Sequence, residues 1–190
     1  MENNLSSKRV AVYIDWSNFY NKMKSPELQI ENLINFNFRG LAEWLVTGRD
    51  IVSCRYYVGV VRAEENNAKG QQLRKEQQKL FAHLTSPSQN FVVKRGYLMN
   101  NDGVYHEKGV DVKLAVDLLV GAYDNLYDVA ILISSDTDLI PAIKKVKHLG
   151  KRVEYIGFSF KPSIALTACA NSTRLLVKDD LSQFMIKNLL

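Results

Sequence analysis

Aspartates follow two apolar segments of the sequence at the point where each segment ends. The segment RVAVYID ends in Asp15, with Asn18 three residues later, and the segment VAILISS is followed by Asp136 and Asp138. In an open parallel sheet, ligands bind beyond the carboxyl ends of the strands, so these side chains are expected to face one another. Oxygen ligands without histidine or cysteine select Mg²⁺ or Mn²⁺. Such an ion polarises a phosphate and activates water, which is the chemistry of phosphodiester hydrolysis.

A further acid opens a later helix, in the motif Lys108-Gly-Val-Asp111. Asp117 lies six residues on and is rotated well away from Asp111 around the helix, so Asp111 is the better site candidate. Asp117 is more simply explained as an ordinary helix pair with Lys113. If the acids of both groups converge, each pair about 4 Å apart repels by on the order of 4 kcal/mol at an effective dielectric of about 20. Either a cation lies among them or some stay protonated.

Each acid also has a purely structural interpretation. Asp136 or Asp138 could cap the helix that begins near Leu139, and Asp111 could complement the dipole of its own helix. Asp15 is harder to explain in this way, because a carboxylate at the end of an apolar strand caps nothing unless the turn after it supplies donors. The joint occurrence of the acids therefore carries the metal hypothesis.

Apolar segments alternate with helical patterns along the whole chain, which predicts an α/β fold with a doubly wound, mainly parallel sheet. The expected strands are residues 9–15, 51–61, 91–98, 129–135 and 152–158, with a short strand-like segment at 174–177. The expected helices are 41–46, 64–84, 109–123, 139–149, 162–170 and 180–189, and a turn at 100–103 suggests a hairpin.

Burial and domain organisation follow from the same patterns. The helix at 64–84 is expected to place Leu73, Leu80, Phe81 and Leu84 on its inner face, and the helix at 109–123 is expected to be well buried. We expect one domain over residues 1–190, with a core at about 8–160 and the C-terminal helices of 161–190 packed on it.

Basic residues gather in three places of this chain of net charge +5, around 62–79, 94–95 and 144–152. A basic rim around an acidic pocket suits a polyanionic substrate. The candidate RNA contacts are Arg62, Arg74, Lys75 and Lys79 for the phosphates, and Trp16 for stacking on a base. A solvated helix carries such charges routinely, and a tryptophan beside a core strand is more often packing.

Several classes of protein are disfavoured by the sequence. No P-loop or GxGxxG motif is present, and no apolar run is long enough to span a bilayer, so a cytoplasmic protein without membrane contact is expected. The two cysteines, Cys54 and Cys169, show no metal-binding spacing and are expected to be buried free thiols.

Three segments in order, YIDWSNFY, EKGVDVKLAVDLL and ILISSDTDLIPAIKKVKHLGKRVEYIGF, resemble the NYN domain family of PIN-like nucleases, specifically its LabA-like branch. The resemblance implies a Rossmann-like, three-layer PIN fold with strand order 3-2-1-4-5 and an acidic Mg²⁺ site that cleaves RNA. By position, it implies that Asp15, Asp111, Asp136 and Asp138 hold the metal with Asn18 as supporting amide, and that Asp117 is another recurrent acid. Two departures are Ser135, where glycine is common, and Ala170-Asn171 in place of a late Ala-Asp.

The leading hypothesis is therefore an endoribonuclease that uses one or two Mg²⁺ or Mn²⁺ ions on single-stranded or loop RNA. Lys108 is a candidate contact to the scissile phosphate, and Ser135 is a candidate supporting residue beside the pocket. The alternatives are an RNA-binding or protein-binding regulatory module with negligible turnover, and cleavage of DNA. Assembly into a homo-oligomer is compatible with the sequence.

Overall fold

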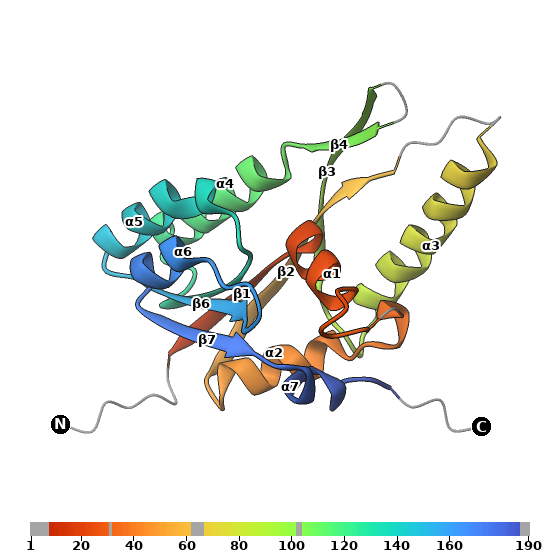
Figure 1. The fold of residues 1–190 in the computed structure, drawn as a ribbon. Helices are drawn as coiled ribbons and strands as arrows, with labels where there is room; N and C mark the ends of the chain where they lie inside the picture. The colour runs from red at the N-terminus through yellow and green to blue at the C-terminus, as the bar shows by residue number, and fades with distance from the viewer. Residues whose placement is uncertain (1–7, 31, 62–66, 102–103, 187–190) are drawn as a thin grey trace.

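In the described part of the chain, seven strands form one sheet between two layers of helices (Figure 1). The computed structural model describes residues 8–30, 32–61, 67–101 and 104–186, and only the backbone at 97–101 and 104–107. The strands are β1 (Arg9–Asp15), β2 (Asp50–Val60), β3 (Val92–Asn101), β4 (Val104–Lys108), β5 (Val129–Ile133), β6 (Arg152–Phe158) and β7 (Ser172–Leu176). The helices are α1 (Trp16–Met23), α2 (Phe38–Val46), α3 (Ala68–Leu84), α4 (Val110–Tyr123), α5 (Ile140–His148), α6 (Ile164–Cys169) and α7 (Lys178–Ser182), with 3₁₀ helices η2 (Leu33–Asn35) and η3 (Thr137–Leu139).

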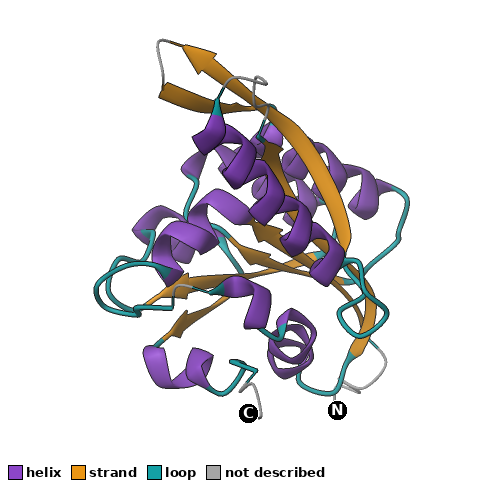
Figure 2. Ribbon diagram, turned by 90° about the vertical axis from the view of Figure 1, so that its right-hand side faces the viewer, coloured by secondary structure: helices purple, strands orange, loops and turns teal. Residues whose placement is uncertain are grey.

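The strand order is β4-β3-β2-β1-β5-β6-β7, and every neighbouring pair is parallel except β3 and β4. The five strands predicted as 3-2-1-4-5 are β3, β2, β1, β5 and β6, so that order is confirmed. The sheet is wider than predicted because β7 pairs with β6 at one edge. At the other edge, β4 folds back on β3 to form a hairpin that extends beyond the helices (Figure 2). The chain leaves β1 toward β2 on one side, and β5 lies on the other, so the carboxyl ends of β1 and β5 flank the switch point.

The two faces of the sheet have separate cores. Val10, Val12 and Ile14 of β1 face the layer formed by α1, α2, α3 and α7. Ala11 and Tyr13 face the opposite layer, formed by α4, α5 and α6. Because both faces are covered, every residue of β5 is buried, which explains why this strand is a continuous apolar run. Among the described helices, none has the length and apolar character needed to cross a membrane.

Helix α4 is less buried than its apolar sequence predicts. Its inner stripe is buried, as Leu114 and Leu118 illustrate. Val112 and Val116 on the outer side are exposed to 67% and 49%, and Tyr123 near the end of the helix is exposed too. The expectation of a well-buried helix is therefore wrong, since the sheet and α5 cover only one side of it.

Two further expectations need correction. Leu73 of α3 is 39% exposed rather than on the inner face, whereas Leu80, Phe81 and Leu84 are buried as expected. The last predicted helix, 180–189, is replaced by the short helix α7, and residues 187–190 lie outside the described chain. The segment after α7 instead hydrogen-bonds to the start of α2: the Asn37 N–H donates to the Phe184 carbonyl at 2.8 Å. The chain after α7 therefore pairs with a distant segment instead of continuing as a helix.

The two cysteines are free and differ in exposure. Cys54 on β2 is 3% exposed, and burial raises the pKa of its thiol to about 11, whereas Cys169 at the end of α6 is half-buried. At pH 8 only about one part in a thousand of the Cys54 thiols would be ionised, and the thiolate is the reactive form. We expect a thiol reagent to label Cys169 in the native protein and both cysteines after unfolding. A native Cys169→Ser variant that still reacts rapidly would contradict this.

Candidate active site

Asp15 is a buried carboxylate at the carboxyl end of β1, with 1% of its surface exposed. As N-cap of α1 it accepts a hydrogen bond from the Asn18 backbone N–H at 3.4 Å, so the turn after the strand does supply a donor. Its Oδ2 atom also accepts from Asn18 Nδ2 at 2.5 Å and from Ser134 Oγ at 2.7 Å. Ser134 follows β5, so these contacts join the ends of the two central strands across the switch point.

The segment after β5 continues this hydrogen-bonded chain. Ser135 Oγ donates to the Asn18 side-chain oxygen, and the Asp136 N–H donates to Ser134 Oγ at 3.1 Å. Asp136 Oδ1 in turn accepts from the Asp138 N–H at 2.9 Å and thereby caps η3. Asp136 therefore is a cap, but of η3 rather than of the helix predicted to begin near Leu139, which has no side-chain cap, and capping uses only one of its two carboxylate oxygens.

The electrostatics at Asp15 favour a cation. Burial raises the pKa of this carboxyl above its ordinary value, the hydrogen bonds from Ser134 and Asn18 oppose that effect, and the negative charge of Asp136 raises the pKa further. A carboxylate that burial and a second carboxylate both destabilise in its ionised form is stabilised by a positive ion beside it.

The other two predicted metal ligands are placed differently. Asp111, in the first turn of α4, and Asp138, in η3, are both exposed, although their two elements are packed against each other. Among the described residues, no three side chains of His, Cys, Asp or Glu come close enough to form a ready metal cage. Mg²⁺ is nevertheless often held by one or two carboxylates, with water and substrate phosphate completing its shell. Asp15 and Asp136 fit that smaller donor set.

Asp117 is engaged elsewhere than predicted. Its Oδ2 atom accepts a hydrogen bond from the Tyr57 hydroxyl at 2.9 Å and lies 3.3 Å from Lys94 Nζ and 3.4 Å from Arg55 Nη1. The predicted pair with Lys113 is wrong, because the Lys113 ammonium donates to a backbone carbonyl of β3 instead. Asp117 thus holds a polar cluster between α4 and the sheet.

Strand register places that cluster beside the acids. Asp15 pairs with Tyr57, and Tyr57 pairs with Lys94. Residues in register on parallel strands point to the same face, so Lys94 shares a row and a face with Asp15, two strands away. Sequence reasoning missed Ser134, and it noted Lys94 only as part of a basic group. The repeated serine of ISSDTD gave a signal for the first, but only the register of the sheet identifies the second.

Of the remaining predicted residues that the structure describes, none belongs to the hydrogen bonds around Asp15. Lys108 ends β4 and is exposed, and Arg74, Lys75 and Lys79 are exposed along α3. Trp16 is half-buried, with its ring 4.3 Å from that of Tyr20 between centroids. Arg62 lies outside the described residues.

A family model, the NYN domain, matches residues 9–176, which run from the first residue of β1 to the last residue of β7. The chain belongs to the NYN domain family. NYN domains are in general PIN-like nucleases that bind RNA and use divalent metal ions. Among solved structures, this NYN domain is similar to a protein of unknown function from Vibrio parahaemolyticus, with 21% identity and a TM-score of 0.61 over 95% of this chain and 99% of that chain. That likeness concerns the fold. Among curated proteins, none matches the sequence significantly.

Proposed function

We propose that this NYN domain is an endoribonuclease of the LabA-like branch that hydrolyses phosphodiester bonds in single-stranded or loop RNA with Mg²⁺ or Mn²⁺. The observation that supports it best is the buried Asp15 carboxylate, fixed by Ser134 and Asn18 beside Asp136 at the switch point of the sheet. The motifs around Asp15, Asp111 and Asp136 support the branch assignment.

In this proposal, Asp15 and Asp136 hold the metal, and Asn18 and Ser134 fix the orientation of Asp15. When bound, the ion supplies Lewis-acid stabilisation of the phosphate and lowers the pKa of water. The exposed Asp111 and Asp138 are suited to hold its water ligands, or a second ion. Ser135 orients the Asn18 amide, and Asp117 fixes the Lys94 ammonium on the face that Asp15 shares. Lys108 is the candidate contact to the scissile phosphate.

A regulatory module that binds RNA without cutting it is the second candidate. It is favoured by the absence of a three-carboxylate group among the residues that the structure describes. The two candidates differ in what a metal ion does: a nuclease needs it for turnover, whereas a binding module retains its RNA affinity without it.

We expect the purified protein to cut a labelled, unstructured RNA when Mg²⁺ or Mn²⁺ is present, because the acids need a cation to face a phosphate. Cleavage should stop in EDTA and return when Mn²⁺ is added in excess. Product length is measured on denaturing gels, with a DNA oligonucleotide of the same sequence as the comparison. If neither metal gives cleavage while RNA affinity persists, the binding module is the correct assignment, and equal cutting of DNA would remove the RNA specificity.

A further inference from the structure

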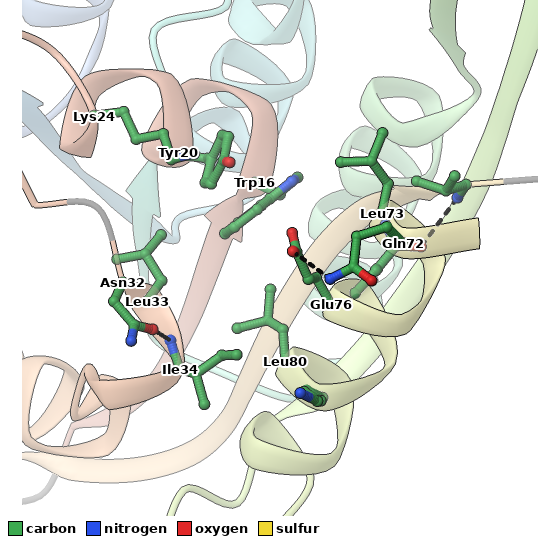
Figure 3. Close-up of a pocket in the computed structure, with 13 residues that line it drawn as sticks. Trp16, Tyr20, Lys24, Asn32, Leu33, Ile34, Gln72, Leu73, Glu76 and Leu80 are labelled. Atoms are coloured by element: carbon green, nitrogen blue, oxygen red, sulfur yellow. Dashed lines mark hydrogen bonds between the residues drawn. The ribbon is translucent and has the colours of Figure 1, made fainter. Parts of the chain in front are cut away.

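A cavity of about 520 Å³ opens between α1, η2 and α3, on the side of the sheet opposite to α4 (Figure 3). Its volume lies within the range of small-ligand sites, and one nucleotide or a part of one fits a space of this size. Val61, the residue directly after β2, also lines its wall. The cavity is separate from the hydrogen bonds among Asp15, Ser134 and Asp136.

One wall of the cavity is aromatic. The rings of Trp16 and Tyr20 on α1 lie 4.3 Å apart between centroids and tilt by 33°. Behind them, the Tyr56 ring supports Trp16 at 5.4 Å, and the Lys24 ammonium lies 4.5 Å from the centre of the Tyr20 ring. Because Trp16 and Tyr20 are only half-buried, part of this aromatic surface is open to a planar ligand.

The opposite wall is formed by α3 and is mixed in character. Leu73 is an apolar residue left 39% exposed, and in Figure 3 it lies across the cavity from Trp16. Gln72 Nε2 donates to Glu76 Oε1 at 2.9 Å, which places an amide and a carboxylate in the same wall. Glutamate accepts hydrogen bonds from the amino group of cytosine. Lys79, also in this wall, adds a positive charge suited to a phosphate.

The cavity and the candidate active site contain residues that are adjacent in the sequence. Trp16 directly follows Asp15, yet it packs with the core on the α1 side of the sheet, whereas the Asp15 carboxylate contacts Ser134. A single strand that crosses the carboxyl edge of the sheet would therefore meet the acids at one nucleotide and the aromatic wall beside them.

We propose that this cavity is the subsite for one unpaired base of the RNA, next to the phosphate that faces the metal ion at Asp15 and Asp136. The base stacks between Trp16 on α1 and Leu73 on α3, and the sugar-phosphate backbone of the RNA runs past Lys24 and Lys79, the two lysines that line the cavity. The choice of RNA as substrate rests on the proposed function. The apolar and aromatic walls suit a flat ring, and the positive charges beside them suit an anion. An unpaired nucleotide has both a flat base and an anionic phosphate.

The test uses the intrinsic fluorescence of Trp16 with Ca²⁺ in place of Mg²⁺, because Ca²⁺ also takes oxygen ligands, and denaturing gels check that the RNA stays intact. The sequence has two tryptophans, so a Trp44→Phe background leaves Trp16 as the reporter. We expect a short oligocytidylate to quench this signal in a saturable manner. In the same background, Leu73→Glu should raise the Kd about tenfold, a typical effect of losing one base-stacking contact. Leu73 is partly exposed, so the change leaves the core intact, and an unchanged Tm checks this.

Gln78→Glu is the matched control, because it adds the same charge on an exposed position of α3 outside the cavity. It should change the Kd by less than about twofold. An RNA backbone of the same length with abasic positions should bind weakly and lose nothing further in Leu73→Glu. Equal weakening by both variants, equal affinity for the abasic backbone, or no saturable quenching would overturn the base subsite. Because the readout is binding, an inactive enzyme that passes this test refutes the nuclease alone, and an active enzyme that fails it refutes the subsite alone.

Discussion

We expect the replacement of Asp136 by asparagine to lower the rate of the proposed RNA cleavage by about a hundredfold or more, while the Tm stays within about 2 °C of the wild type. Asparagine is as good a helix cap as aspartate, so the hydrogen bond from the Asp138 N–H can persist. What is lost is the negative charge beside Asp15, and a metal contributes several kcal/mol of transition-state stabilisation. A loss of about 3 kcal/mol corresponds to the expected hundredfold effect. Single-turnover cleavage in Mg²⁺ and Mn²⁺, with thermal unfolding in parallel, measures both quantities.

The matched control for this prediction is Asp179→Asn, which removes one exposed carboxylate from the first turn of α7. It changes the net charge of the protein by the same amount and should leave the cleavage rate within about twofold. If Asp136→Asn cleaves as fast as Asp179→Asn, then Asp136 is only a helix cap and the metal-site proposal fails. Asp136→Asn is more informative than Asp136→Ala, because it removes the charge and keeps the cap, whereas alanine removes both.

Replacing Phe38 by alanine lowers the free energy of unfolding by about 3–5 kcal/mol. Phe38 begins α2 and is fully buried, and its ring centroid lies 5.0 Å from that of Phe36, 5.5 Å from that of Tyr56 and 6.0 Å from that of Phe19. Truncation leaves a cavity that these rings cannot fill by a small movement. For a chain of this length, the expected decrease in Tm is about 10 °C. Urea and thermal unfolding, followed by far-UV circular dichroism, measure the change.

Val112→Ala provides the comparison for that result, because Val112 is 67% exposed on the outer side of α4. Its effect on the free energy of unfolding should stay within about 0.5 kcal/mol. A loss at Val112 as large as the loss at Phe38 would mean that another surface covers α4 in solution. A loss at Phe38 below about 1 kcal/mol would mean that the aromatic core on the α1 side is not packed as described.

The arrangement around Asp15 explains why the carboxylate can be buried without being strained. Three hydrogen bonds, from the Asn18 backbone, the Asn18 side chain and Ser134, satisfy its oxygens. The same bonds hold it in one orientation at the ends of β1 and β5. A group that is fixed before substrate arrives loses little entropy when it binds an ion, which is the usual requirement for a precise metal site.

The sequence patterns were sufficient for the five central strands, and the resemblance to NYN domains implied their order, whereas β4 and the full length of β7 came only from the structure. The apolar segments at 9–15 and 129–135 are long enough and apolar enough to require cover on both faces, which only a central parallel strand obtains. The acids at their ends follow from the same segments, so Asp15 and Asp136 could be selected without coordinates. The type of each strand and the acid at its end depend on residues close together in the sequence, so local sequence patterns are enough to predict them.

Only the tertiary structure decided which side chains meet. Ser134 rather than Ser135 reaches Asp15, across 119 residues of sequence, because the register of β5 against β1 points it there. The pairing of β2 with β3 brings Tyr57 and Lys94 together beside Asp117. The packing of α3 and α4 leaves Leu73 and Val112 exposed on helices whose patterns suggested burial. A helical pattern shows which residues share a face, but the fold decides which face is covered, since burial depends on elements distant in the sequence.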